Sequence, residues 1–191
     1  MGLIVLLVII AVVLFWVLGA YKRLIALKNQ VLNAWKQIDV QLKRRHDLIP
    51  NLVNTVKGAM DFERGTLESV IAARNRAVSA TGVHDTARAE GELTQALGRL
   101  FALTEAYPDL KATGNVAQLQ EELTSTENKI GFARQLYNDM ATQYNTRQMQ
   151  FPTSLVAGLA KASPAELWEI EDAGERAVPV VDLTSPRPPA A

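Results

Sequence analysis

The hydrophobic pattern of this chain opens with an unbroken apolar run. The first twenty residues, MGLIVLLVIIAVVLFWVLGA, contain no charged side chain. Because a helix rises about 1.5 Å per residue, a helix of this length spans roughly 30 Å, the thickness of the hydrocarbon core of a bilayer. The run therefore predicts a transmembrane helix over residues 1–21.

A cleaved signal peptide is the alternative interpretation of the same run. Signal peptides carry a basic segment before the apolar core, and that core is only about 7–15 residues long. This chain has neither feature, since no basic residue precedes the run. We therefore favour a retained membrane anchor, with cleavage as the second interpretation.

Beyond the run, hydrophobic residues recur at the spacing of amphipathic helices. On a heptad grid, one stripe that only Arg45 interrupts holds Val31, Trp35, Ile38, Leu42, Ile49, Leu52, Val56 and Ala59. A second stripe holds Val116, Leu119, Leu123, Ile130, Ala133, Tyr137, Met140 and Tyr144. Alternating β-branched runs are missing before the C-terminal end of the chain. The pattern predicts an all-α protein.

Turn-forming residues divide the helical part at SATGVHD, AYPDLKATG and QFP. We expect the transmembrane helix to continue into one very long helix near residues 22–80. Helices near 85–106 and 115–150 would fold against it as an elongated antiparallel bundle, because a lone amphipathic rod cannot bury its apolar stripe.

The end of the chain carries a different pattern. Ser163, Pro164 and Glu166 resemble the start of a last short helix through Trp168. The remaining residues read as extended and then disordered. The domains expected are therefore an anchor over 1–21, a helical bundle over 22–174 and an extended or disordered tail over 175–191.

The charges next to the apolar run predict its orientation. From residue 22 to residue 45 there is one acid, Asp39, against seven basic residues: Lys22, Arg23, Lys28, Lys36, Lys43, Arg44 and Arg45. Basic residues beside a span tend to stay in the cytoplasm, so we expect a single-pass protein with a short outer N-terminus and a cytoplasmic helical domain. Trp16, Tyr21, Lys22 and Arg23 are expected at the membrane interface.

The remaining composition limits the chemistry that this chain can perform. The net charge is zero, with 20 basic and 20 acidic residues, so nothing indicates nucleic-acid binding. There is no cysteine nucleophile, no G-x-S-x-G elbow, no phosphate-binding glycine loop and no dinucleotide fingerprint. We expect no catalytic, cofactor-binding or metal-binding residues and no cofactor.

The stretch QLKRRHDLIPNL, residues 41–52, is the densest candidate for a site. His46 and Asp47 are adjacent, so they point about 100° apart on a helix, and no second histidine follows one turn later, as a metal site would need. Pro50 marks either a bend within one helix or a restart with Asp47 as N-cap. His46 is expected to be solvated or hydrogen-bonded, and to tolerate alanine with little loss of stability.

Arg45 is the charged residue that interrupts the first hydrophobic stripe. Its guanidinium must reach water along its own stem or meet an acid inside the bundle. The acids that flank the second stripe are Glu121, Glu122, Glu127 and Asp139, and one of them is the expected partner. Such a pair would help to hold the helices in register.

Several long motifs then become informative together. AWKQIDVQLKRRHDLIPNLVNTVKG, AYPDLKA, LQEELTSTENKIGFARQLYNDMATQYN and FPTSLVA follow in this order behind the apolar run. From Tyr21 to Leu183 they resemble the LemA family of bacterial membrane proteins. The resemblance implies an N-terminally anchored, mostly helical protein of the bacterial cell (inner) membrane, without an established enzymatic activity. It also implies a link to magnetosome membranes for one relative and to membrane-bound zinc metalloproteases encoded near some members.

The leading hypothesis is a non-enzymatic, membrane-anchored scaffold that self-associates or docks partner proteins through its long helices. An accessory or regulatory subunit of a membrane-bound metalloprotease is the alternative. The expected partners are the lipid bilayer, further copies of the chain and, in the alternative, the protease, but not nucleic acid. Structural or interaction roles are expected for Trp35, Arg44, Arg45, Asp47, Pro50, Tyr137, Asn138 and Tyr144.

Overall fold

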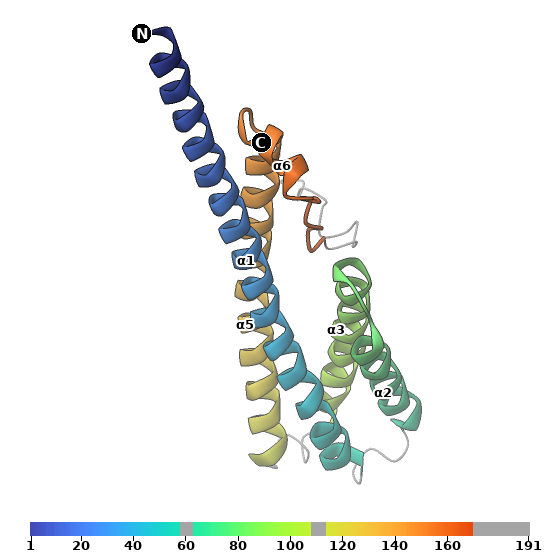
Figure 1. Cartoon of the computed structure of the whole chain (residues 1–191). Helices are drawn as coiled ribbons and strands as arrows, with labels where there is room; N and C mark the ends of the chain where they lie inside the picture. The colour runs from blue at the N-terminus through green and yellow to red at the C-terminus, as the bar shows by residue number, and fades with distance from the viewer. Residues whose placement is uncertain (58–62, 108–113, 170–191) are drawn as a thin grey trace, which may run out of the picture.

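The computed structural model describes residues 1–57, 63–107 and 114–169 of the chain. These residues form the helices α1 (Gly2–Lys57), α2 (Arg64–Ser79), α3 (Val83–Glu105), α5 (Gly114–Met149) and α6 (Thr153–Leu159) (Figure 1). Within the described ranges no residue lies in a strand. The all-α prediction is confirmed, and the helices expected near 85–106 and 115–150 correspond to α3 and α5.

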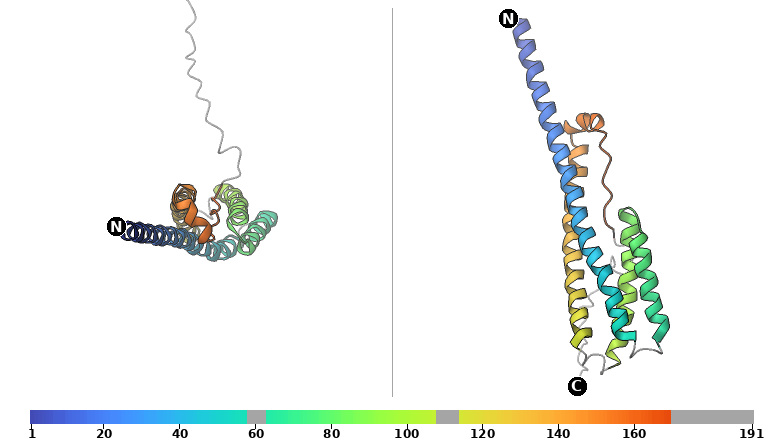
Figure 2. Two further views of the ribbon diagram at one scale, coloured as in Figure 1. Left: turned by 45° about the horizontal axis from the view of Figure 1, so that its top comes forward. Right: turned by 60° about the horizontal axis from the view of Figure 1, so that its bottom comes forward.

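Helix α1 is the long helix of the molecule. Its 56 residues run without a break from the apolar segment into the core of the bundle, over about 84 Å. The N-terminal part extends beyond the other helices (Figure 2) and leaves its large apolar side chains exposed. Pro50 lies inside α1, so it does not separate two helices.

The prediction of one helix from residue 22 to residue 80 is wrong at its C-terminal end. α1 ends at Lys57, and α2 runs back along the bundle to pack against α1 and α3 (Figure 1). The reason is burial: α2 carries its own apolar stripe of Leu67, Val70, Ala73 and Ala77. A straight continuation of α1 would expose this stripe, whereas the reversal buries it in one cluster with residues of α3.

Helices α1 and α5 form the antiparallel pair that organises the bundle. Trp35 lies beside Tyr137, and Arg45 lies beside Glu127. The two contacts are separated by the same number of residues on each helix, as an antiparallel register requires. The heptad stripes of the two helices therefore face each other, apart from Ala59, which lies outside the described residues.

The core of the bundle is divided into two hydrophobic clusters. The first joins α1 beyond Ile49 to α2, α3 and the first part of α5, up to Leu123. The second joins α1 up to Leu42 to α5 beyond Ile130 and to the C-terminal segment. The polar layer between the two clusters contains Arg45 and His46 of α1.

The prediction of a last helix from Ser163 through Trp168 is also wrong. After α6, residues 162–169 form no helix and instead follow α5 as an irregular strap. Side chains of α5 bind the strap backbone, which therefore gains outside the helix the hydrogen bonds that a helix would supply within itself. The predicted tail over 175–191 lies outside the described residues.

Candidate functional site

Arg45 is the centre of the polar layer. Its Nη1 lies 3.2 Å from Oε2 of Glu90 on α3 and 3.0 Å from Oε2 of Glu127 on α5. Its Nη2 donates to Oγ1 of Thr94 at 2.8 Å. Arg45 and Glu90 are both buried, so α1, α3 and α5 meet at one desolvated ion pair. Glu127 belongs to the four acids considered from the sequence, whereas Glu90 does not.

Glu127 extends this layer to a second guanidinium. Its Oε1 accepts from Nη2 of Arg134 at 3.4 Å. Arg45 and Arg134 together balance the charges of Glu90 and Glu127, which lowers the cost of holding four ionised groups between two apolar clusters. The balance makes the layer suited to holding three helices in register.

His46 is buried beside Arg45 and hydrogen-bonded, which is one of the two expected states, and its burial argues against the expected tolerance of alanine. Its Nε2 lies 2.6 Å from Oε1 of Glu90, so the two neighbouring side chains hold the two oxygens of one carboxylate. Because a carboxylate only accepts, Nε2 carries the proton and donates it. The sequence argument considered α1 alone, and α3 fills the side of α1 toward which His46 points.

The neighbourhood of Pro50 explains why a proline is tolerated inside α1. Proline has no N–H, so the carbonyl of the residue four positions earlier, His46, loses its helical donor. Nε of Arg74 on α2 donates to that carbonyl oxygen at 2.9 Å. A side chain of α2 thus supplies the hydrogen bond that Pro50 cannot donate, and this bond links α2 to α1.

Removing this tie should reveal that Pro50 and Arg74 act together. Arg74→Ala should lower the free energy of unfolding by about 1 kcal/mol, the lower end of the usual cost of leaving a carbonyl without a donor, because this carbonyl is partly buried. In a Pro50→Ala background the new N–H can bond to the His46 carbonyl, so the same substitution should have a smaller effect. Urea denaturation of the four variants of this double-mutant cycle measures the coupling.

Arg76→Ala is the matched control for the preceding cycle, because Arg76 lies on α2 like Arg74 but forms an exposed pair with Glu92 of α3. Its substitution should change the stability by about 0–1 kcal/mol in either background. An Arg74→Ala effect that is equal with proline and with alanine at position 50 would contradict the link.

A cluster of aromatic side chains lies next to the polar layer. The Trp35 ring lies 5.5 Å from Tyr137 and 6.0 Å from Trp168 of the strap, between ring centroids. The guanidinium of Arg134 lies 5.7 Å from the Trp168 centroid, within the range of a cation–π interaction. Arg134 therefore links the polar layer to the aromatic residues and, through them, to the strap.

Two asparagines of α5 attach the strap. Asn138 Nδ2 donates to the Trp168 carbonyl at 3.0 Å, and its Oδ1 accepts from the Trp168 N–H at 2.8 Å. Asn145 makes the same pair of bonds with Ala165, both at 2.8 Å. Since the two asparagines are seven residues apart, they lie on one face of α5. Each side-chain amide thus bonds to both the N–H and the C=O of one strap residue, as the backbone of a neighbouring strand would.

The two tyrosines named from the sequence differ in their surroundings. The Tyr137 hydroxyl donates to the Glu166 carbonyl at 2.7 Å. Burial raises the pKa of Tyr137, and the charge of Glu166 adds to the rise, so this donor keeps its proton at neutral pH. Burial also raises the pKa of Tyr144, whose hydroxyl has no hydrogen-bond partner among the residues that the structure describes.

The other residues named from the sequence lie at the surface. Arg44 is 3.8 Å from Glu122, and Asp47 pairs with Lys43 at 3.2 Å, both in exposed positions. Trp16, Tyr21, Lys22 and Arg23 are exposed on α1 at the C-terminal end of the apolar segment. These exposed residues therefore take no part in the polar layer or the aromatic contacts.

Glu90, Arg74 and Arg134 were missed from the sequence. Glu90 could have been found, because it falls on the buried stripe of α3 together with Thr86, Leu93 and Leu97, as Arg45 does on α1. Two opposite charges on two apolar stripes indicate an ion pair. In the described part of the chain, no group of three or more His, Cys, Asp or Glu is placed to hold a metal ion.

Comparison with known proteins adds an independent result. A model described as the LemA family matches residues 34–183. Protein LemA of Metamycoplasma hominis is 29% identical over 150 residues, which cover 78% of this chain and 68% of that protein. Magnetosome protein MamQ 2 of Paramagnetospirillum magneticum is 30% identical over 87 residues, but these cover 46% of this chain and 32% of that protein. The family model spans most of the chain, including the polar layer and the aromatic strap, and this protein therefore belongs to the LemA family.

Proposed function

We propose that this protein is a non-enzymatic, membrane-anchored scaffold whose helical domain self-associates through one face of the α1–α5 pair. Support for the anchor comes from α1, whose N-terminal segment is long and apolar enough to cross a membrane. This segment continues as the same helix into the core, so the bundle would stand rigidly on the membrane. The excess of Lys and Arg after the segment favours a cytoplasmic bundle.

The observation that carries the proposal is an exposed apolar face on the two longest helices. Leu32 and Val40 of α1 are 51% and 63% exposed, and Phe132 and Leu136 of α5 are 74% and 39% exposed. Val40, Phe132 and Leu136 line one groove of about 460 Å³ between the helices. Contiguous apolar side chains of this size on a helical surface are typical of a protein interface.

Membrane anchoring favours a second copy of the chain as the occupant of this face. Copies that share one membrane stand parallel, so the same face of two neighbours can meet about a twofold axis normal to the bilayer. Lys36 and Lys129 border the groove, and their stems can lie along it while their ammonium groups stay in water. The face can therefore close against itself without burying either charge.

The size of the full-length protein in mild detergent tests the proposal. By light scattering on a sizing column, the wild type should be at least dimeric. Val40→Ser combined with Phe132→Ser should shift it to a monomer, because the change removes the two most exposed of these four apolar side chains without altering the net charge. Val78→Ser on α2 is the matched control, since Val78 is equally apolar and 53% exposed but lies elsewhere, and it should leave the size unchanged.

A monomeric wild type would refute self-association and would turn this face into a docking surface for a different protein, such as a membrane protease. Assemblies that persist in the Val40→Ser, Phe132→Ser variant would refute the choice of face.

A further inference from the structure

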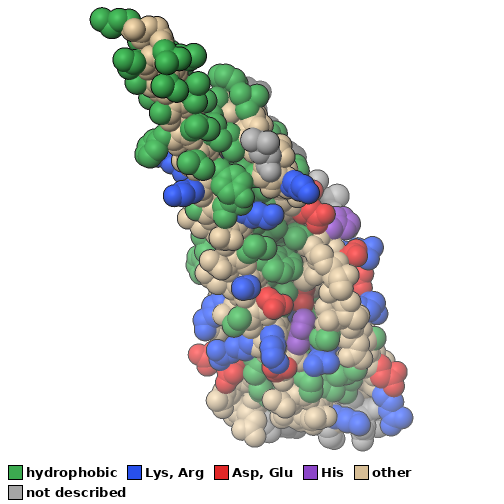
Figure 3. Space-filling view, in the orientation of Figure 1, with side chains coloured by type: hydrophobic (Ala, Val, Ile, Leu, Met, Phe, Trp, Pro, Cys, Tyr) green, Lys and Arg blue, Asp and Glu red, His purple; other side chains and the backbone are tan. Residues whose placement is uncertain are grey.

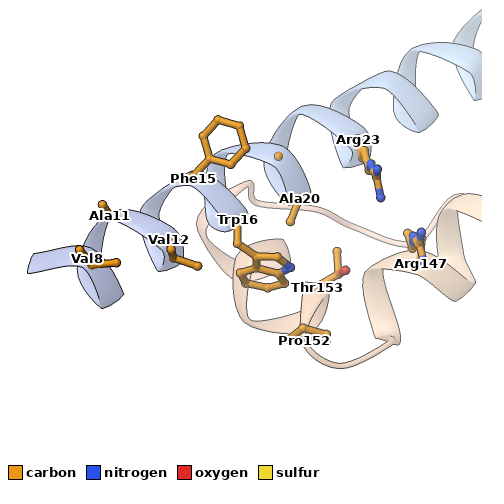
Figure 4. A pocket seen from close by; sticks show the side chains of 11 residues that line it. Val8, Ala11, Val12, Phe15, Trp16, Ala20, Arg23, Arg147, Pro152 and Thr153 are labelled. Atoms are coloured by element: carbon orange, nitrogen blue, oxygen red, sulfur yellow. The ribbon is translucent and has the colours of Figure 1, made fainter. Parts of the chain in front are cut away.

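A groove runs along the apolar segment of α1, between this segment and the turn that joins α5 to α6 (Figure 4). Its volume is about 750 Å³. One wall consists of two neighbouring rows of α1, in which residues recur at every fourth position from Val8 to Ala20 and from Ala11 to Arg23. Pro152 and Thr153 form the other wall beside Trp16.

The length of the groove matches one leaflet of a bilayer. From Val8 to Arg23, α1 rises about 22 Å. A bilayer measures roughly 40–45 Å with its headgroups, so one leaflet is about 20–22 Å thick. The groove therefore extends from the middle of a membrane to the headgroups when the apolar segment spans the bilayer.

The ends of the groove differ in charge. Arg23 of α1 and Arg147 of α5 lie together at the end away from Val8 (Figure 4). Among the described residues, neither guanidinium forms an ion pair with a carboxylate. Guanidinium groups bind phosphate oxygens through charge-assisted hydrogen bonds, which makes this end complementary to a phosphodiester.

The turn between α5 and α6 is itself apolar on the outside. Met149, Phe151 and Leu155 are largely exposed, while Val156 and Ala157 of α6 are buried. Hydrophobic side chains cover the N-terminal part of α1 and the adjoining top of the bundle, and Lys and Arg side chains follow below them (Figure 3). The turn thus continues the apolar surface of the segment, as expected of a structure that dips into the bilayer interface.

We propose that this groove binds one anionic phospholipid of the leaflet next to the helical domain. Its phosphate lies between Arg23 and Arg147, and one acyl chain lies along the rows of α1 from Ala20 toward Val8. The turn between α5 and α6 closes the groove from the side. The inference rests on the proposed membrane anchor, and it makes the α5–α6 turn a second contact with the same membrane.

Lipid retention by the full-length protein tests the groove. The protein is reconstituted in vesicles of phosphatidylcholine mixed with phosphatidylglycerol and extracted with mild detergent, and the retained phospholipids are identified by native mass spectrometry. The wild type should retain phosphatidylglycerol in preference to phosphatidylcholine. Arg23→Gln with Arg147→Gln should reduce the affinity for phosphatidylglycerol by roughly 30-fold, because each basic group near an anionic lipid contributes about a factor of five.

Gly19→Leu tests the acyl part separately. Nothing lies within 4 Å of a Cβ built at Gly19, so the leucine can enter the groove without disturbing the helix. It should reduce the retention of both lipids, which loss of a headgroup contact alone would not do. Lys22→Gln with Lys28→Gln is the matched control, since it removes two positive charges from α1 near Arg23 but outside the groove, and it should keep the retained lipid.

Each remaining outcome has a definite meaning. Equal retention by the wild type and the double arginine variant would refute the phosphate site, and an equal loss in the lysine control would reduce the effect to general surface charge. Alkaline carbonate extraction of the vesicles separates the two proposals. Release of the protein would refute the anchor, whereas a protein that stays in the membrane but retains no phospholipid would refute the groove alone.

Discussion

Replacing Arg45 with alanine should lower the free energy of unfolding by about 3–5 kcal/mol, since the change strands a buried carboxylate. Glu90 would lose the guanidinium at 3.2 Å and, among the described residues, keep His46 at 2.6 Å as its side-chain partner. Glu127 would keep Arg134 and remain 36% exposed, so water can replace part of its lost contact. Chemical denaturation of the full-length protein in detergent measures the loss.

Double-mutant cycles should show that the two carboxylate partners of Arg45 contribute unequally to this loss. The coupling of Arg45 with Glu90 should exceed its coupling with Glu127, because only Glu90 is fully buried. Lys43→Ala is the matched control, since its pair with Asp47 is exposed on the same helix, and it should change stability by about 0–1 kcal/mol. If Arg45→Ala were as mild as Lys43→Ala, the polar layer would not hold the helices together.

Replacing Trp168 with alanine should lower the free energy of unfolding by about 3–5 kcal/mol, the usual range for removal of a buried aromatic ring. The ring packs on Trp35 and lies beneath the guanidinium of Arg134, so three contributions disappear together: the apolar burial, the aromatic contact and the cation–π interaction. The strap should then detach from α5, which limited proteolysis near residue 165 can detect in parallel with urea denaturation.

Leu167→Ala is the control for the strap, because Leu167 is adjacent to Trp168 but 39% exposed. It should lower stability by much less than Trp168→Ala and leave the strap resistant to protease. Trp168→Phe should recover part of the loss, since a smaller ring still fills some of the space beside Trp35. Equal effects of Leu167→Ala and Trp168→Ala would mean that the Trp168 contacts do not hold the strap on α5.

Part of this architecture follows from the sequence by itself. The apolar segment, α3 and α5 were predicted near their observed positions, because helical periodicity is a local property that a stripe of apolar residues reports directly. The conflict at Arg45 was also visible, since a charge on a buried stripe demands a partner. Because α1 and α5 were expected to pair, the candidate partners of Arg45 were sought beside the apolar stripe of α5, and one of them, Glu127, does contact Arg45.

Other features were decided only when the helices packed. The reversal after Lys57, the burial of His46 and the pairing of Glu90 all depend on where α2 and α3 lie, and periodicity within one helix does not say which neighbour covers each side. The same holds for the strap. Ser163, Pro164 and Glu166 resemble a helix start, yet Asn138 and Asn145 supply hydrogen bonds that stabilise a non-helical backbone.

One physical cause separates the features that the sequence predicts from those that packing decides. Local sequence determines which backbone hydrogen bonds a segment can make within itself and which of its faces is apolar. Residues far away in the chain supply the other contacts. They provide the partner of a buried charge, the donor to the His46 carbonyl that Pro50 cannot serve, and the ring that packs on Trp35. Those contacts exist only in the packed bundle. The sequence of this LemA-family protein therefore determined its apolar segment and the apolar stripes of its helices, while the tertiary structure decided where the chain reverses and which residues meet.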